Sequence, residues 1–222
     1  MAFKNIVKIW NNSKIDKKNV EFLTIATKLV KLPLTKYDKK IIKDLKDTAS
    51  RISCAGIAAN QIGHSKKIFI GFEDNSLKSF KIYINPEIIR TFENFIVGAY
   101  QDKVNHIHKK NPNDHIYEGC LSLPDAEFSF PRYHKIEVKY LDEAGNEVIE
   151  ILEKFHAQIF QHETDHLNGK TIAHRYLESL QNQKGGTLIP IGLEEIENID
   201  EINKNIDNLD DQFDLLSKLI SK

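Results

Sequence analysis

The spacing of apolar residues predicts three helices. Downstream of Asp38, apolar side chains recur at intervals of three and four and would share one helix face. A second helix is expected over residues 154–167, followed by the stop signal Asn168-Gly169, because glycine readily adopts the left-handed conformation that closes a helix. Near the C-terminus, intervals of 4, 3, 4, 3 and 4 predict a third helix with a narrow apolar seam. The first face consists of Ile41, Ile42, Leu45, Ala49 and Ile52, and the seam of Ile202, Ile206, Leu209, Phe213, Leu216 and Ile220.

Four segments have the composition of β-strands, being rich in β-branched and aromatic residues or alternating apolar with charged ones. They are residues 66–72, 80–86, 135–141 and 147–152. The last two would pair as a hairpin across the turn "DEAGN" at 142–146. Residues 1–37 and 95–117 have no clean period, and we expect an irregular lead-in and a long polar loop there.

The composition is that of a soluble globular protein, with 41% hydrophobic and 28% charged residues among 222. A formal net charge of −1 gives the whole molecule no electrostatic attraction for nucleic acid or anionic membranes. No apolar run reaches the length that spans a bilayer, the N-terminus lacks the pattern of a secretory signal, and two cysteines make no disulfide framework. We therefore expect a cytoplasmic protein with neither nucleic-acid nor membrane partners.

The C-terminal region, residues 186–222, reads as an acidic extension with an amphipathic helix. Residues 194–214 contain nine acidic residues and one lysine. The apolar seam could pack on its own domain, pair with a second copy or meet another protein, and packing on its own domain is the favoured reading. RNA would repel such a tail, so we assign it no ribosome-binding role.

The stretch "QHETDHLNG" at 161–169 has the pattern of a helical metal site. Positions i and i+4 share a helix face, so His162 and His166 can direct two imidazole nitrogens at one ion, with Glu163 beside them as a general base. An ordinary polar helix face is the alternative. A catalytic site also needs a third ligand, and His174 does not have the spacing of a downstream histidine ligand.

Cys120, in "EGCLSLP" at 118–124, is the best candidate for that third ligand. As a thiolate it would suit Fe(II) or Zn(II). A lone cysteine is also commonly a small buried apolar residue, so the residue type alone leaves both roles open.

Together with "CAGIAANQIG" at 54–63, these two stretches resemble, in the same order, the three signature motifs of the peptide deformylase family. The resemblance covers roughly residues 30–175. It implies an α+β fold in which antiparallel β-sheets pack around a central metal-binding HExxH helix. It also implies a metal-dependent hydrolase that removes the N-formyl group from the formylmethionine of newly made proteins and releases formate. The expected catalytic domain is 1–185, with an insertion at 95–117.

The resemblance also implies a role for each matching residue. The metal ligands are Cys120, His162 and His166, and they hold one divalent ion, usually Fe(II), which Zn(II), Ni(II) or Co(II) can replace. Glu163 moves the proton of a metal-activated water. The side chain of Gln61 and the backbone N–H of Leu121 stabilise the negative charge that develops on the formyl oxygen.

Substrate contacts are expected near two glycines, because family substrates bind as an added β-strand. Gly56 and Gly119 would lie beside this strand. An apolar pocket for the methionine side chain would use Ile57, Ile159 and Leu123, although packing in the core accounts for the same apolar residues equally well.

Three positions depart from the family pattern and leave the substrate open. Cys54 and Asn60 stand where the family usually has Gly and Pro, and Thr164 stands at a usually apolar position, so its helix face is expected to be less buried. An alternative function is therefore a deformylase-like hydrolase that acts on a different formylated or acylated peptide or small molecule. A non-catalytic metal- or peptide-binding module is a third reading, and an endopeptidase ranks last because it leaves Cys120 and Gln61 without a role. The expected oligomeric state is a monomer or a homodimer through the C-terminal helix.

Overall fold

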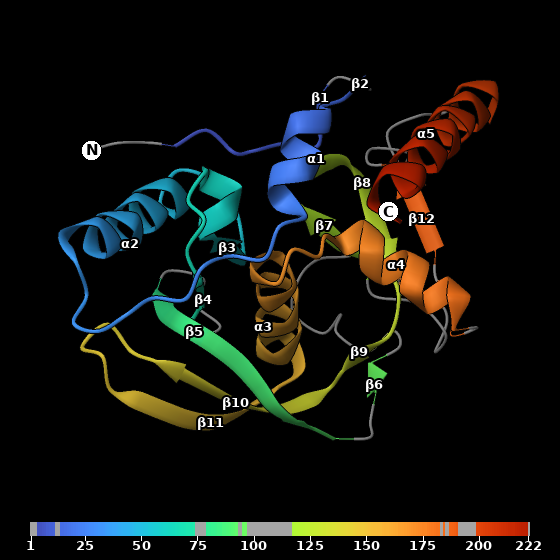
Figure 1. Ribbon diagram of the computed structural model, residues 1–222. Coiled ribbons are helices and arrows are strands. Elements are labelled where there is room, and N and C mark those ends of the chain that lie inside the picture. Colours follow the sequence, from blue (N-terminus) through green and yellow to red (C-terminus); the bar gives the residue numbers. More distant parts are fainter. Residues whose placement is uncertain are drawn as a thin grey trace. The chain divides into compact units, whose positions relative to one another are not determined.

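The computed structural model describes residues 4–11, 14–73, 79–92, 95–96, 117–182, 184, 187–190 and 199–221. These residues form five α-helices and antiparallel β-sheets, so the protein belongs to the α+β class (Figure 1). They divide into two compact units. The first contains the chain up to Val7, Ile25–Ile96 and Arg132–Lys170; the second contains Lys8–Thr24, the segment ending at Pro131, and the chain from Thr171 onward.

The first unit is built on a five-stranded antiparallel sheet of order β11-β10-β5-β4-β3. The strands are β3 (Gly56–Ala58), β4 (Ile68–Phe72), β5 (Phe80–Thr91), β10 (Lys135–Leu141) and β11 (Glu147–Glu153). The β10–β11 hairpin and its turn are as predicted. Strand β5, in contrast, continues five residues beyond the predicted end at Pro86. Although proline cannot donate to the ladder, pairing resumes at Glu87 opposite Lys139 after a shift of register.

Helix α3 (Lys154–Leu167) has the predicted bounds and lies across one face of this sheet (Figure 1). Its Phe160 meets Phe69 of β4 and Tyr83 of β5 edge-on, with ring centroids 5.3 Å apart in each case. These rings form the centre of a buried apolar cluster between the helix and the sheet. Gly169, at φ 73°, follows the end of the helix as its stop signal.

Helix α2 (Lys36–Ala49) begins two residues before the predicted start. The reason is a capping box, in which Thr35 and Asp38 each satisfy a backbone N–H of the other. The helix buries Ile41, Ile42 and Leu45 as predicted, whereas Ile52 lies beyond its end. It packs against β3 and β4, and every residue of β4 is buried.

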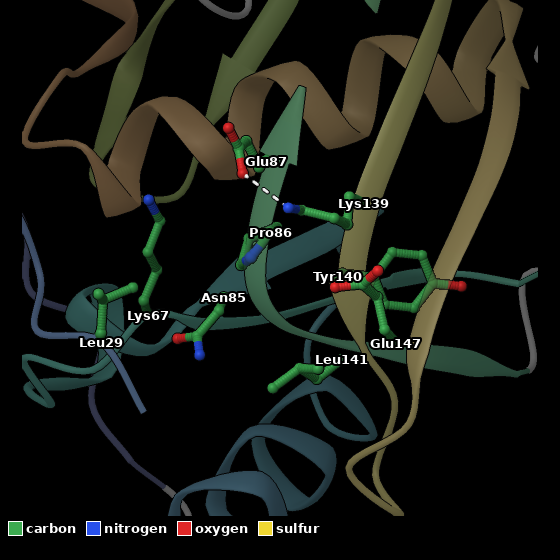
Figure 2. Close-up of a pocket in the computed structure, with 9 residues that line it drawn as sticks. All are labelled: Leu29, Lys67, Asn85, Pro86, Glu87, Lys139, Tyr140, Leu141 and Glu147. Atoms are coloured by element: carbon green, nitrogen blue, oxygen red, sulfur yellow. Dashed lines mark ion pairs between the residues drawn. The ribbon is translucent and has the colours of Figure 1, made fainter. Parts of the chain in front are cut away.

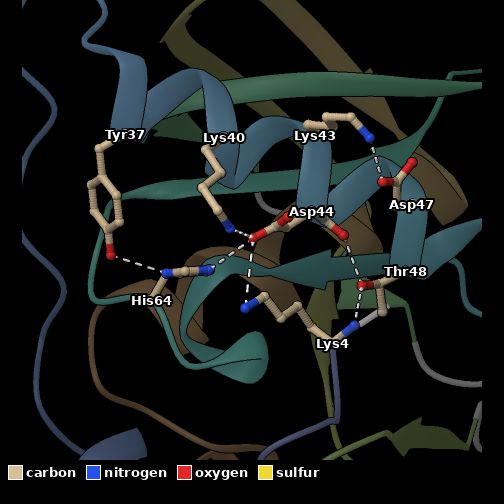
Figure 3. A network of polar contacts seen from close by, with 8 residues as sticks. All are labelled: Lys4, Tyr37, Lys40, Lys43, Asp44, Asp47, Thr48 and His64. Atoms are coloured by element: carbon tan, nitrogen blue, oxygen red, sulfur yellow. Dashed lines mark hydrogen bonds and ion pairs between the residues drawn. The ribbon is translucent and has the colours of Figure 1, made fainter. Parts of the chain in front are cut away.

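A buried polar network joins α2 to the loop that follows the 3₁₀ turn η1 (Ala59–Ile62) (Figure 3). In this network, Oδ2 of Asp44 lies 2.6 Å from Nζ of Lys40 and 3.3 Å from Nε2 of His64. The other ring nitrogen of His64, Nδ1, lies 3.0 Å from the hydroxyl of Tyr37. Burial would raise the pKa of Asp44, but the hydrogen bond and charge of Lys40 outweigh it and lower the pKa. Burial also lowers the pKa of His64.

The second unit contains a three-stranded sheet of order β12-β8-β7, a short hairpin and three helices. Its strands are β1 (Trp10–Asn11), β2 (Lys14–Ile15), β7 (Glu118–Cys120), β8 (Leu123–Ser129) and β12 (Thr187–Pro190), and its helices are α1 (Lys17–Leu23), α4 (Ile172–Gln181) and α5 (Ile199–Ile220). In the first unit, β6 (Phe95–Ile96) pairs with β9 (Arg132–Tyr133). Residues 97–116 of the expected insertion lie outside the described residues.

The described part of the α5 seam is buried within its own unit. Leu209, Phe213 and Leu216 are each at most 8% exposed. The ring of Phe213 lies 5.2 Å from that of Tyr176 in α4 and 6.1 Å from that of Phe128 in β8. The seam predicted from the sequence therefore serves at least partly for internal packing. Across the described helices, none is long and apolar enough to cross a membrane.

Candidate active site

The two motif histidines lie on adjacent turns of α3. The ring centroids of His162 and His166 are 5.0 Å apart, with an interplanar angle of 65°. His166 is buried, whereas His162 is half-buried. The four-residue spacing thus places both imidazoles on one helix face, as the sequence predicts.

Cys120, at the end of β7, is buried and joins these histidines in a group that could hold a metal ion. Its Sγ and one ring nitrogen from each histidine all lie within 4.8 Å of one another. One thiolate and two imidazoles form a donor set that suits Fe(II), Co(II), Ni(II) and Zn(II). The chemistry of the side chains therefore fits a divalent first-row metal.

Glu163 of α3 is buried against the backbone of β3. A Cβ atom added to Gly56 would lie 2.7 Å from Oε1 of Glu163, closer than any real contact allows. Gly56 pairs in register with Gly71 of β4. A Cβ atom added to Gly71 would lie 3.1 Å from a methyl carbon of Ile159. The two glycines thus allow α3 to approach the sheet closely. Sequence reasoning assigned Gly56 to the substrate and did not anticipate its proximity to Glu163.

Gln61 lies in η1 and is almost fully buried. Its carboxamide oxygen accepts the backbone N–H of Ala58 at 2.9 Å. Because this bond uses the oxygen, it orients the carboxamide and leaves the NH₂ group as its donor end. The side chain is therefore bonded to the backbone of its own turn through its oxygen, and its NH₂ group is a hydrogen-bond donor of the kind that stabilises an oxyanion.

Asn60, also in η1, contacts the ligand helix directly. Its side-chain amide donates to the backbone carbonyl of His166 at 2.6 Å, and Asn60 is only 1% exposed. The sequence identified Asn60 only as a departure from the proline that is usual in the family, and gave it no contact. The contact joins residues 106 positions apart, which no local pattern reveals.

Two further sets of bonds connect α3 to β9. Arg132 and Asp165 form a buried ion pair at 2.6 Å. Gln161 accepts from the backbone N–H of Tyr133 at 3.0 Å and donates to its carbonyl at 2.8 Å. Thr164 is 5% exposed, so the expectation of a less buried helix face at this position is wrong. Helix α3 contacts β9 and η1 as well as the strands of the sheet, so more of its surface is buried than the sheet alone would cover.

Cys54 lies close enough to Glu163 for the charge of the carboxylate to affect the pKa of its thiol. Burial, with a smaller contribution from the charge of Glu163, raises the pKa of the Cys54 thiol to about 12. The thiol is therefore protonated at neutral pH. Cys54 is also not part of the group formed by Cys120, His162 and His166, which separates this cysteine from the proposed ligand Cys120.

The residues expected to contact substrate differ in accessibility. Ile57 and Leu123 are fully buried, and Ile159 is 6% exposed. Gly119 is exposed, and a Cβ atom added to it would meet no neighbouring atom within 4 Å, while Leu121 is half-buried. Their roles toward a peptide stay predictions.

A separate hollow of about 380 Å³ lies in the first unit (Figure 2). Its lining includes Asn85 and Pro86 of β5, with Glu87 and Lys139 forming an ion pair at 3.6 Å across neighbouring strands. None of the residues predicted for catalysis or metal binding lines it. This hollow is therefore not the candidate active site.

Comparison with known proteins agrees with the motifs. A model of the polypeptide deformylase family matches residues 13–183, more than three quarters of the chain. The chain belongs to this family. Deformylases remove the N-formyl group from nascent peptides and depend on a metal ion, and all the residues predicted for the site lie within the matched range.

The chain is also similar to individual peptide deformylases. A peptide deformylase of Brachyspira hyodysenteriae is 36% identical over 149 residues, which cover 65% of this chain and 70% of that protein. One from Synechocystis is 30% identical over 164 residues, covering 70% and 78%. Among solved structures, peptide deformylase from Thermotoga maritima has a TM-score of 0.59 at 29% identity, covering 79% of this chain and 98% of that one. A class I type b deformylase from Acinetobacter baumannii, at 24% identity, has a TM-score of 0.62 and covers 79% and 99%.

Proposed function

We propose that the protein removes the N-formyl group from the N-terminal formylmethionine of newly made proteins and releases formate. The observation that carries this proposal is the grouping of Cys120, His162 and His166 in a chain of the deformylase family. We propose these three residues as the ligands of one divalent ion, Fe(II) in the native protein, with Zn(II), Ni(II) or Co(II) as possible replacements. Such an ion makes a bound water acidic enough to act as a nucleophile near neutral pH.

Glu163 is the proposed general base and acid. It would take a proton from the attacking water and deliver it to the amine that leaves when the formyl C–N bond breaks. Its position one residue after His162 supports this role, since it lies next to the ligands on the same helix. Close packing against Gly56 restricts the carboxylate to few orientations.

Two donors would stabilise the formyl oxygen as it gains negative charge. One is the NH₂ group of Gln61, whose carboxamide is oriented by the bond from Ala58. The other is the backbone N–H of Leu121, the residue after Cys120. Donors of this kind contribute most in the transition state, where the charge is largest.

The proposed substrate is an N-formylmethionyl peptide bound as an extended strand. Gly56 and Gly119 would lie beside its backbone, and the exposed, uncrowded position of Gly119 supports close approach of another chain. Ile57 and Ile159 are proposed to contribute to the methionine pocket, with Ile159 the more accessible of the two.

The remaining proposals concern the organisation and setting of the chain. We propose a catalytic domain over residues 1–185 and an acidic extension over 186–222, working in the cytoplasm on nascent chains without binding nucleic acid directly. For the oligomeric state we propose a monomer or a homodimer through α5. The burial of Leu209, Phe213 and Leu216 within their own unit supports the monomer.

Formate release from formyl-Met-Ala-Ser tests the activity. We expect release by the wild-type protein, and Glu163→Gln should lower kcat by about 10²–10⁴-fold while the bound metal is retained. Glu143→Gln, which alters an exposed glutamate paired with Lys46, is the matched control and should behave as wild type. Full activity of Glu163→Gln would contradict the proposed mechanism.

A second candidate is a hydrolase for a different formylated or acylated substrate, which the presence of Cys54 near Glu163 favours. A panel of formyl peptides that differ only in the first residue separates the two. A preference for methionine in kcat/KM supports the first function, whereas a preference for another side chain supports the second.

A further inference from the structure

We propose that Asn60 is a positioning residue that fixes the Gln61 turn to the metal-ligand helix. This inference rests on the proposed function, because it assigns the turn and the helix to one reaction centre. Its basis is the hydrogen bond from the Asn60 side chain to the carbonyl of His166 at 2.6 Å. Asn60 immediately precedes Gln61, and His166 is one of the proposed ligands.

This hydrogen bond is made to a carbonyl in the last turn of α3, where the helix itself provides no N–H donors. The last four carbonyls of an α-helix have no partner within the helix. Backbone N–H groups of Asn168, Gly169 and Lys170 reach three of them, including a 3.2 Å contact from Gly169 to the carbonyl of His166. Asn60 adds a shorter bond to that same carbonyl, and Thr27 binds the carbonyl of Leu167 through both its N–H and its hydroxyl.

The environment of Asn60 shows that the bond is not incidental. The side chain is 1% exposed, so water does not readily replace the amide if it is lost. None of the described residues donates to its Oδ1, which is also buried. Burying an unsatisfied oxygen is unfavourable, and an apolar side chain would avoid it. The amide is therefore best explained by the one bond that it makes.

The consequence is a fixed distance between two parts of the reaction centre. The donor at Gln61 would have to lie where charge develops on the formyl oxygen, and that place would be set by the ion that the two histidines are proposed to hold. A displacement of about 1 Å can cost about 10²-fold in rate. Partners that orient metal ligands from outside also typically change metal affinity or activity by about 10–100-fold.

The family usually carries proline at this position, which allows a sharp test. Proline would restrict the backbone of η1 but has no amide to donate. If rigidity is what matters, Asn60→Pro should equal or exceed the wild type. If the hydrogen bond matters, Asn60→Pro, Asn60→Ala and the isosteric Asn60→Asp should all be impaired.

The experiment measures kcat and KM with formyl-Met-Ala-Ser, and separately the affinity for Co(II) and the Co(II) absorption spectrum. We expect each Asn60 variant to lose about tenfold or more in kcat, with a smaller change in KM, and to show weakened Co(II) affinity or a shifted spectrum. Thr27→Val is the matched control, since it removes the hydroxyl bond to the neighbouring carbonyl without contacting Gln61 or a ligand. It should lower thermal stability while leaving kcat and the Co(II) spectrum unchanged.

Wild-type values for Asn60→Pro in both assays would overturn the inference. Failure of all three Asn60 variants to fold, alongside a folded Thr27→Val, would overturn it as well, because Asn60 would then serve the stability of the fold. If the wild-type protein releases no formate, the proposed function fails, but the Co(II) measurements still decide whether Asn60 orients the ligand helix.

Discussion

Glu163 occupies the space that a side chain on Gly56 would fill, with its Oε1 2.7 Å from the position of the missing Cβ. The proposed base and the first strand of the sheet are therefore in direct contact. This makes Gly56 important for the chemistry even before any substrate is bound.

Replacing Gly56 by alanine should displace the carboxylate of Glu163. We expect kcat to fall by about 100-fold, because the proton acceptor would no longer lie beside the attacking water. Gly71→Ala is the matched control: it crowds Ile159 rather than Glu163, and the nearest atom is a methyl carbon at 3.1 Å. Formate release and metal content of both variants check this. Equal losses in the two variants would mean that general loosening of α3, not displacement of the base, causes the effect.

The two cysteines should respond differently to substitution by serine. Cys120→Ser should lose most of its bound metal and its activity, since a hydroxyl is a much poorer ligand than a thiolate. Cys54→Ser should keep its metal, because Cys54 is not part of the group formed by Cys120, His162 and His166. Metal analysis of the purified proteins measures this, and loss of metal from Cys54→Ser would count against the proposed ligand set.

Stability should decline below neutral pH through the network around Asp44. Burial lowers the pKa of His64 in the folded state below the unfolded value of about 6.5. The unfolded state therefore takes up the proton first, and the free energy of unfolding falls as the pH drops through about 6.5. Asp44, whose folded pKa is lowered chiefly by Lys40 against the opposing effect of burial, adds a further loss as the pH falls through its lowered pKa.

Urea denaturation between pH 8 and pH 4 measures this dependence. His64→Gln should flatten the part of the curve between neutral pH and about pH 5, because glutamine does not titrate. A curve parallel to that of the wild type over this range would show that other groups cause the decline.

Loss of the buried pair between Arg132 and Asp165 should be costly. Both side chains are 6% exposed, so Asp165→Asn removes one partner of a pair that water reaches poorly. We expect the free energy of unfolding to drop by about 3–5 kcal/mol. The exposed pair of Lys46 and Glu143 gives the contrast, and breaking it should cost about 0–1 kcal/mol. Similar losses at both pairs would contradict this ranking.

The elements that the sequence predicts well are those whose signal is local. Helix α3 has a clear period and a glycine stop, and the β10–β11 hairpin alternates apolar and charged residues around a recognisable turn. Helix α1 was missed because seven residues make only about two helical turns, and strands β7 and β12 because three and four residues are too few for an alternation to emerge. Helix α4 and strand β8 were also missed, and they lie in stretches where polar and apolar residues do not follow a single period.

Within the candidate site, the motifs identify residue types but not the contacts among them. The spacing of His162 and His166 suffices to place both on one helix face. Two other features depend on contacts between segments that are about a hundred residues apart. They are the hydrogen bond from Asn60 to the His166 carbonyl and the close packing of Glu163 against Gly56. Such contacts follow from tertiary packing and leave no trace in any short window of sequence.

In the last turn of α3, the carbonyl of His166 is bonded to Asn60, which precedes it by 106 residues. The geometry of this turn is thus acquired only when the polypeptide has closed this long loop. An unfolded chain would offer the same imidazoles without their arrangement, so the strength with which an ion is retained reports how completely the protein has folded.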